Sequence, residues 1–341
     1  MTRVRTAELA TLLTGLYRAT GMTRGGARVL AEAHLSAQAR GVESHGVRLA
    51  PGFLAKLRAG RLVPRPRLCV TRTSSVTAWV RADRAPGPLA AHAAMSLAGA
   101  RARRHGVGLI TVRGMGHVGA LGDTIVPLAR TGLIGLAVAQ TSSPGVALLP
   151  HGTEPVLGTT PLAFAAPAGN AREPLLYDGA PAALSWGAVK HARRARTPLP
   201  PAGALDGEGR MTRSAKDVAA LLPSSPQAQA LALCLELMAG PLTGSEPIPS
   251  GKDGRGLLVL AVSPAFLGLN AATVPSAVEL LRGAAHAAGA RLPGDGSWPH
   301  AAAHTDHYDL DDDVLDSLLA AAHAGGVRVT LTRPPEKGGT P

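Results

Sequence analysis

The sequence is poor in cysteine, in aromatic side chains and in long hydrophobic runs. Its two cysteines, Cys69 and Cys234, are too few for a disulfide framework or for a zinc site built from cysteines of this chain alone. The first twenty residues lack the apolar core of a secretory signal, and no run reaches the length needed to cross a bilayer. We therefore expect a soluble, cytoplasmic protein with no membrane partner.

Aromatic side chains make up only 3% of the 341 residues, which bears on the meaning of the formal net charge of +12. Proteins that bind nucleic acid combine clustered Lys and Arg with aromatic side chains on which bases stack. Here the positive charges are spread along the chain, and the densest cluster, residues 189–197, is interpreted as the exposed side of a helix. We therefore expect no nucleic-acid partner.

What the chain does contain is a globular composition, with 45% hydrophobic and 17% charged residues. A chain of this length ordinarily divides into more than one domain. Amphipathic spacing predicts helices over residues 6–19 and 27–40. The prolines at positions 64 and 66 then mark a domain boundary.

Beyond these prolines, apolar and β-branched stretches alternate with stretches that have helical spacing. The expected strands cover residues 68–80, 107–113, 132–140, 161–167 and 255–264. The expected helices cover residues 89–105, 228–240, 274–289 and 311–325, the last with Asp311 as its cap. Residues 197–214, rich in proline and glycine, are expected to form a surface excursion.

A Gly-x-Gly-x-x-Gly pattern follows one of the predicted strands, at residues 114–119. Such a turn is typical of dinucleotide-binding folds, which also place an Asp or Glu about 20 residues further on to bind the ribose. The next apolar run ends in Gln140, Thr141 and Ser142, so the acid is missing. A histidine, His117, lies inside the glycine loop, so the loop presents an imidazole where a pyrophosphate would need bare backbone.

Several segments, taken in order, carry a family resemblance. They are "RGVESHGVRLAPGFLAKLRAGRLVP", "HGVGLITVRGMGHVGALGD", "GLIGLAVAQTSSPGVALLPHG", "LGTTPLAFAAP", "ALCLELMAGPLTG" and "RLPGDGSW". Together they resemble the type 2 malate/L-lactate dehydrogenase family, which includes ureidoglycolate and sulfolactate dehydrogenases and piperideine-carboxylate reductases.

The resemblance implies an α/β fold that binds NAD(P) without being a Rossmann fold, with a mixed sheet flanked by helices. Residues 1–66 and 296–332 would form a helical, substrate-side domain, and residues 67–295 a central cofactor-type domain. Residues 333–341 are expected to be a flexible tail. The resemblance also implies a homodimer with active sites near the subunit interface.

The same resemblance assigns roles on the substrate side. Ser44, His45 and Arg48 match a Ser-His-Gly-x-Arg substrate segment, and His117 matches the histidine that donates and accepts a proton. An arginine can bind a carboxylate through two parallel hydrogen bonds, and an imidazole can exchange a proton near neutral pH. The implied reaction is reduction of a small anionic substrate, a 2-oxo or cyclic 2-imino acid, by NAD(P)H.

The cofactor side departs from the family pattern. The segment expected to contact the dinucleotide reads "DGAPAA" at residues 178–183, and a glycine-rich segment with a lysine is replaced by "SSPQAQA" at residues 224–230. Gln227 takes the place of that lysine. The residues assigned to the cofactor are Thr141, Asp178, Gly179, Ala180 and Gln227.

These departures leave two hypotheses open. In the first, the protein is a nicotinamide-dependent reductase with a remodelled cofactor pocket. In the second, the dinucleotide site is lost, and His45 and His117 carry out isomerisation, elimination or cyclisation with Asp178 as a helper. A third possibility, a relative without catalysis, is disfavoured because the substrate-side residues are retained.

A separate cluster, His300, His304 and His307, has the spacing of metal ligands if the segment is helical. A polar surface segment explains the same residues more simply. We expect no metal site there.

Overall fold

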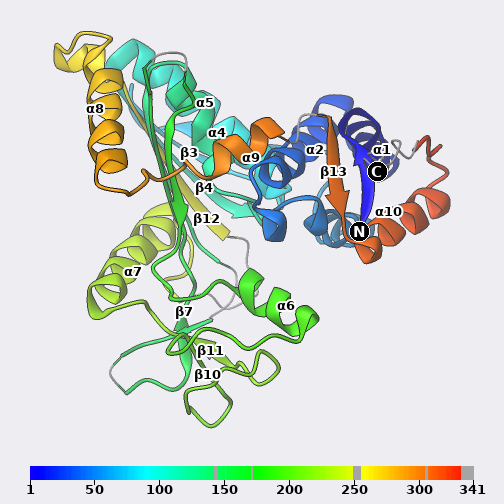
Figure 1. The fold of residues 1–341 in the computed structure, drawn as a ribbon. Coiled ribbons are helices and arrows are strands. Elements are labelled where there is room, and N and C mark those ends of the chain that lie inside the picture. Colours follow the sequence, from blue (N-terminus) through cyan, green and yellow to red (C-terminus); the bar gives the residue numbers. More distant parts are fainter. Residues whose placement is uncertain (142–144, 150, 170–171, 249–254, 304–305, 332–341) are drawn as a thin grey trace, which may run out of the picture. The chain divides into compact units, whose positions relative to one another are not determined.

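The computed structural model describes residues 1–141, 145–149, 151–169, 172–248, 255–303 and 306–331. By its internal contacts the chain divides into two compact units (Figure 1). The first unit combines Met1–Pro66 with Gly294–Pro341, and the second is Arg67–Pro293. The segment predicted to be a flexible tail, residues 333–341, lies outside the described residues.

The first unit packs helices against a two-stranded sheet. Its elements are β1 (Thr2–Arg5), α1 (Thr6–Ala19), α2 (Arg24–Ala39), two 3-10 turns (Glu43–His45 and Val47–Leu49), α3 (Ala50–Arg58), α9 (Ser297–Ala303), β13 (His307–Leu310) and α10 (Asp312–Ala324). β1 and β13 pair antiparallel, with Thr2 opposite Leu310. Leu9, Leu13 and Leu16 on α1 are completely buried, as the spacing of apolar residues predicts.

The two N-terminal helices predicted from the sequence are confirmed, and the start of α2 has a local cause. The Oγ1 of Thr23 accepts a hydrogen bond from the N–H of Gly26 at 3.1 Å, so the helix begins at Arg24. The prediction that Asp311 caps the last helix is wrong. Asp311 occupies the N-cap position of α10, but its side chain makes no capping hydrogen bond, because it pairs with Arg48 instead.

The second unit is built on a seven-stranded mixed sheet. The strands, in their order across the sheet, are β2 (Cys69–Arg72), β3 (Thr77–Arg81), β4 (Val107–Met115), β12 (Arg255–Val262), β5 (Ile134–Ala139), β8 (Leu162–Ala166) and β9 (Leu175–Gly179). β3 and β4 are parallel, and the other neighbouring pairs are antiparallel. The strands expected over residues 107–113, 132–140, 161–167 and 255–264 are thereby confirmed, whereas the stretch 68–80 forms two antiparallel strands, β2 and β3.

The position of β12 explains why the glycine pattern is not a dinucleotide-binding turn. A Rossmann turn joins neighbouring parallel strands through a helix. Here β4 and β5 have the same direction, but β12 lies between them and is antiparallel to both. The glycine loop at residues 114–119 therefore belongs to a mixed sheet of different topology.

Helices cover both faces of this sheet (Figure 1). α4 (Gly87–His105) and α5 (Gly122–Arg130) lie on one face, where a Cβ on Gly108 would meet the carbonyl of Ala98 in α4. α7 (Pro226–Ala239) lies on the other face, where Leu235 packs against Val138 of β5. Within the described ranges, no helix has both the length and the apolar character that spanning a membrane requires.

A smaller sheet with its own core completes the second unit. Its strands, in order, are β10 (Ala204–Leu205), β11 (Ala220–Leu221), β6 (Val146–Ala147) and β7 (Pro155–Leu157), and α6 (Trp186–Ala195) packs on it. The prediction of a surface excursion over residues 197–214 is wrong in part, because Leu199 is only 2% exposed. Most of the cationic cluster on α6 is exposed, as expected.

Candidate functional site

Three sequence-predicted site segments meet at one edge of the seven-stranded sheet. β4, β5 and β9 run in the same direction, so their C-terminal ends lie at this edge. His117 follows β4, Thr141 follows β5, and Asp178 with Gly179 ends β9. Loops at the ends of sheet strands are common places for binding and catalytic residues.

The loop after β4 holds the imidazole of His117 through its own backbone. The N–H of Gly119 donates a hydrogen bond to Nδ1 of His117 at 2.9 Å. Since a backbone N–H can only donate, a neutral ring in this contact carries its proton on Nε2. In this tautomer the Nε2–H of His117 is a hydrogen-bond donor.

The first residue of α4 fixes the same loop from the other side. A Cβ added to Gly87 would lie 2.2 Å from the carbonyl oxygen of His117, so only glycine fits there. The N–H of Gly116 also donates to the carbonyl of Ala85 at 2.8 Å. Residues 85–87 thus contact this loop at two points and determine where His117 lies.

Asp178 acts on the helix that follows this loop. Its Oδ2 accepts a hydrogen bond from the N–H of Gly122, the first residue of α5, at 2.8 Å. A carboxylate is favourable at a helix N-terminus, where backbone N–H groups lack partners. Asp178 thus ties β9 to α5, and its assignment as a catalytic helper stays a prediction.

The two segments assigned to the cofactor are joined by hydrogen bonds. The N–H of Ser224 donates to the carbonyl of Pro181 at 3.0 Å, and the N–H of Ala183 donates to that of Leu222 at 2.8 Å. Segments 178–183 and 224–230, about 45 residues apart in the sequence, therefore lie side by side within the second unit.

The second of these segments forms the start of α7. Ser225 is the N-cap, and its Oγ accepts a hydrogen bond from the N–H of Ala228 at 3.1 Å. Pro226 occupies the first turn, where its missing N–H costs nothing. The side chain of Gln227 is exposed on this turn.

The donor set of this region fits part of a nicotinamide dinucleotide. Thr141 and Gln227 offer uncharged hydrogen-bonding groups, which suit a carboxamide and ribose hydroxyls. A helix N-terminus would suit a diphosphate, but at α5 the carboxylate of Asp178 already fills that place. The uncharged groups would therefore suit the nicotinamide and ribose portions, whereas the start of α5 does not offer a diphosphate site.

A buried network of polar side chains, which the sequence did not predict, lies next to Thr141 in the chain. Gln140 donates to Oε1 of Glu236 at 2.7 Å and to the carbonyl of Glu246 at 2.6 Å. The hydroxyl of Thr160 donates to Oε2 of Glu236 at 2.5 Å. Burial raises the pKa of Glu236, while the two side-chain donors oppose that rise. The network fixes the end of β5, directly before Thr141.

The substrate-side residues lie together in the first unit. The Oγ of Ser44 lies 2.9 Å from Nδ1 of His45. The glycine that follows is required by packing, because a Cβ on Gly46 would lie 2.6 Å from Oε1 of Gln38. Gln38 also accepts a hydrogen bond from the N–H of Val47 at 3.3 Å. α2 therefore supports the turn that carries His45.

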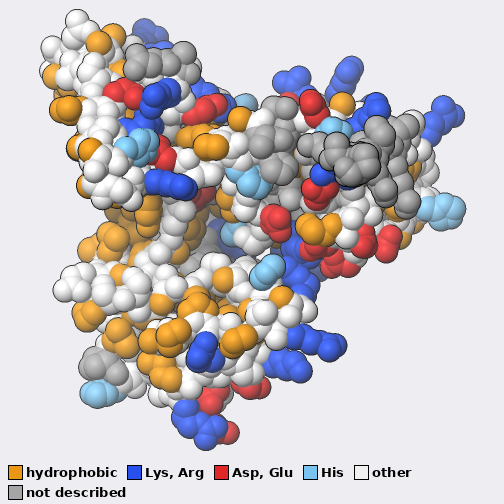
Figure 2. All heavy atoms as spheres, in the orientation of Figure 1, with side chains coloured by type: hydrophobic (Ala, Val, Ile, Leu, Met, Phe, Trp, Pro, Cys, Tyr) orange, Lys and Arg blue, Asp and Glu red, His pale blue; other side chains and the backbone are white. Residues whose placement is uncertain are grey.

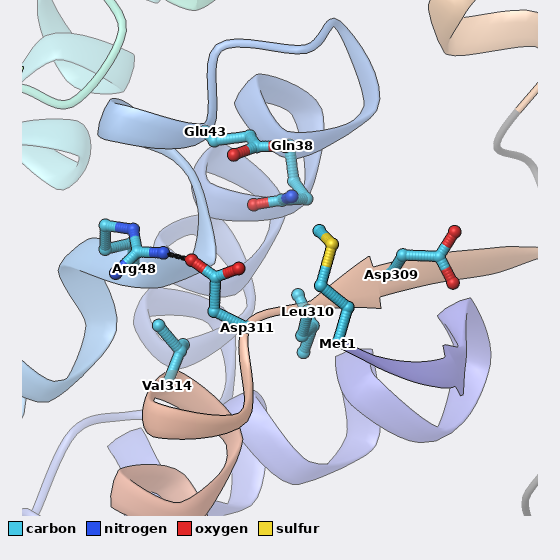
Figure 3. Close-up of a pocket in the computed structure, with 8 residues that line it drawn as sticks. All are labelled: Met1, Gln38, Glu43, Arg48, Asp309, Leu310, Asp311 and Val314. Atoms are coloured by element: carbon cyan, nitrogen blue, oxygen red, sulfur yellow. Dashed lines mark ion pairs between the residues drawn. The ribbon is translucent and has the colours of Figure 1, made fainter. Parts of the chain in front are cut away.

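Arg48 borders a small pocket that is partly open to solvent. The lining residues are Met1, Gln38, Glu43, Arg48, Asp309, Leu310, Asp311 and Val314 (Figure 3). The guanidinium forms an ion pair with Asp311, and its Nη1 lies 3.4 Å from Oδ2 of Asp313. The predicted substrate arginine is thus already paired with acids of its own unit.

A buried histidine beneath this turn was also missed. His34 on α2 has no exposed surface, and its ring lies edge-on to Phe53 with the centroids 5.2 Å apart. Burial lowers the pKa of His34 to about 4, and the nearby backbone of His45 partly opposes this shift. The only feature of the sequence that could have indicated its burial is that His34 lies among apolar residues of a helix.

The structure thus gathers Ser44, His45 and Arg48 within one unit, and His117 with the cofactor-side residues within the other. Their convergence on one substrate stays a prediction.

The histidine cluster does not form the helical array that its spacing assumed. His300 lies on α9, where its Nδ1 is 2.7 Å from the carbonyl of Ala39, and His307 lies on β13. His304 lies outside the described residues. Over the part of the chain that the structure describes, no three side chains of ligand type are grouped so that they could hold a metal ion.

Comparison with known proteins gives a consistent result. A family model described as malate/L-lactate dehydrogenase matches residues 4–319. A Delta(1)-pyrroline-2-carboxylate/Delta(1)-piperideine-2-carboxylate reductase from Pseudomonas putida is 35% identical over 279 residues, covering 77% of this chain and 80% of the relative. A (2R)-3-sulfolactate dehydrogenase (NADP(+)) from Chromohalobacter salexigens is 31% identical over 330 residues, covering 92% of this chain and 96% of the relative.

A solved structure agrees with these sequence matches. The crystal structure of delta1-piperideine-2-carboxylate reductase from Pseudomonas syringae pvar. tomato superimposes with a TM-score of 0.84 at 30% identity. The superposition covers 94% of this chain and all of that one.

Proposed function

Because the chain belongs to the malate/L-lactate dehydrogenase family, we propose that it is an oxidoreductase that reduces a 2-oxo acid or a cyclic 2-imino acid with a nicotinamide cofactor. Within the structure, the proposal depends on one observation above the others. The imidazole of His117 is held as an Nε2–H donor at the same sheet edge as Thr141 and Asp178.

In this proposal the site residues have different roles in the reaction. When bound, the reduced nicotinamide supplies the hydride to the carbon of the C=O or C=N group. The oxygen or nitrogen must gain a proton, and the Nε2–H of His117 is the donor assigned to it. Arg48 binds the carboxylate, and His45, with Ser44 on its Nδ1, orients the reacting group. The product is a 2-hydroxy acid or a cyclic 2-amino acid.

The assembly proposed for this enzyme is a homodimer, and the composition of α7 supports it. This helix has leucines on its exposed side as well as on its buried side, a pattern typical of helices covered on both sides. Leu235 is buried against the sheet, whereas Leu237 is 61% exposed and Leu242, just beyond the helix, is 58% exposed. Figure 2 shows hydrophobic side chains gathered on the visible face of this part of the second unit. We propose that a second copy of the chain packs against these exposed hydrophobic side chains.

Titration of the purified protein with NADH and with NADPH, followed by fluorescence or calorimetry, tests the proposed function. We expect saturable binding of at least one cofactor. The His117→Ala variant should still bind it but reduce Δ1-piperideine-2-carboxylate or a 2-oxo acid at least about a hundredfold more slowly, the range for losing a general acid. His92→Ala, an exposed histidine on α4, is the matched control and should react as the parent does.

Absence of saturable cofactor binding would contradict the proposal. Turnover that depends on His117 but not on added cofactor would instead support the redox-inactive alternative. Neither the fold nor the relatives favour that alternative.

A further inference from the structure

The partners of Arg48 are unusual for a residue that is to bind a ligand carboxylate. Asp311 stands at the N-cap of α10, yet its carboxylate leaves the helix uncapped and pairs with the guanidinium (Figure 3). Asp313, two residues further on, lies with its Oδ2 3.4 Å from Nη1 of Arg48. Arg48 therefore has two acids as partners before any ligand arrives.

Exposure distinguishes these two acids. The side chain of Arg48 is 19% exposed and that of Asp311 is 36% exposed, whereas that of Asp313 is 64% exposed. Charges that are partly withdrawn from water interact more strongly than charges at the surface. Asp311 is thus the stronger competitor for Arg48, and Asp313 is a nearby acid of equal charge with a weaker contact.

A ligand carboxylate that reaches Arg48 must displace Asp311 or lie beside it. The displaced carboxylate of Asp311 can accept hydrogen bonds from the N–H groups in the first turn of α10, because these receive no side-chain cap. A ligand with a second carboxylate also meets Glu43, which lines the same pocket, whereas the other lining acid, Asp309, is already paired with Arg3 at 3.1 Å. Repulsion between the second carboxylate of such a ligand and the carboxylates of Glu43 and Asp311 disfavours binding.

We propose that Asp311 is a specificity-determining residue: it competes with the substrate carboxylate for Arg48 and selects monocarboxylates over dicarboxylates. The inference rests on the proposed function, in which Arg48 binds the carboxylate of the substrate.

Calorimetric titration of the full chain with L-lactate and with L-malate, which differ by one carboxylate, tests the inference. Asp311→Asn removes the charge but keeps a side chain that caps a helix equally well, so the fold is retained. We expect it to tighten L-lactate binding about threefold. L-malate binding should tighten about tenfold, since a dianion is freed from two repulsions where a monoanion is freed from one.

Asp313→Asn is the matched control, because it removes an equal charge two residues away. The inference is wrong if Asp311→Asn leaves both affinities within about twofold of the parent, weakens them, or acts no more strongly than Asp313→Asn. It is equally wrong if neither the parent nor Asp311→Asn binds either acid.

Arg48→Gln separates this failure from failure of the proposed function. Loss of binding in Arg48→Gln together with no effect of Asp311→Asn would overturn the inference alone. Unchanged binding in Arg48→Gln would overturn the assignment of Arg48 to the substrate carboxylate.

Discussion

At the scale of single residues, the imidazole of His34 makes the first unit sensitive to acid. Its ring is fully buried beside Tyr17 and Phe53, and burial lowers its pKa to about 4. The ordinary pKa of histidine is 6.5, so the unfolded chain binds a proton that the folded chain does not between these two values. The free energy of unfolding therefore falls as the pH falls from 6.5 toward 4.

His34→Phe should remove this contribution. Between pH 7 and pH 5 the parent should lose about 2 kcal/mol more unfolding free energy than the variant, from the pKa difference and the linkage relation. Urea unfolding at the two pH values measures the difference. His92→Phe, an exposed histidine, should keep the pH dependence of the parent. Equal pH dependence in His34→Phe and the parent would show that His34 is not held neutral.

The sequence predicted the local part of the site better than its distant contacts. His117 and its glycine loop, and the adjacency of Ser44 to His45, follow from neighbouring residues. The pairing of Arg48 with Asp313 joins residues 265 positions apart, which no local pattern reports. Glu236 was missed because an acid within an apolar helix gives no sign of its partners.

At the scale of secondary-structure elements, the close approach of α4 to the loop after β4 determines where His117 lies. The contact depends on the missing side chain of Gly87. Any Cβ there would overlap the backbone of His117, and a backbone cannot move aside as a flexible side chain can. The start of the helix and the loop must therefore shift together.

Gly87→Ala should lower kcat/KM at least about tenfold, because displacement of about 1 Å in a catalytic group has effects of this size or larger. Gly283→Ala on α8 (Thr273–Ala287) is the matched control, since a Cβ there meets nothing within 4 Å. It should leave kcat/KM unchanged and raise the unfolding free energy by about 0.4–1 kcal/mol. Steady-state kinetics and urea unfolding of both variants measure these effects. Unchanged kcat/KM in Gly87→Ala would contradict the importance of this contact.

The sequence predicted the long elements and missed the short ones. α1, α4, β4 and β12 have enough residues for their periodicity to be read. β6, β10 and β11 have two residues each, too few for any alternation to appear. β1 and β13 were missed because a strand pair between distant segments is defined by its partner and not by its own sequence.

At the scale of the whole molecule, the family resemblance and the mixed α/β fold read from the sequence are confirmed. The order of strands, with β12 between β4 and β5, was not predicted, because the resemblance implied only a mixed sheet flanked by helices. Alternation and apolar runs identify strands, but they carry no information on which strands become neighbours.

The proposed homodimer predicts that a charge on α7 separates the subunits. Leu237→Asp should shift the mass measured by light scattering from that of a dimer to that of a monomer, because a buried unpaired carboxylate is costly at an apolar interface. Met211→Asp adds the same charge at a side chain that is 62% exposed, against 61% for Leu237, and should remain dimeric. A Leu237→Asp variant that stays dimeric would place the interface elsewhere.

The pairing of β1 with β13 has a consequence during synthesis on the ribosome. Thr2 is made before the whole of Arg67–Pro293, but its strand partner, Leu310, is made only after it. The inserted unit therefore has all of its residues available and can begin to fold before β13 and α10, which pack against α1 and α2, have been made. Until the ribosome has passed that strand, the leucines of α1 and α2 lack the core partners that β13 and α10 supply.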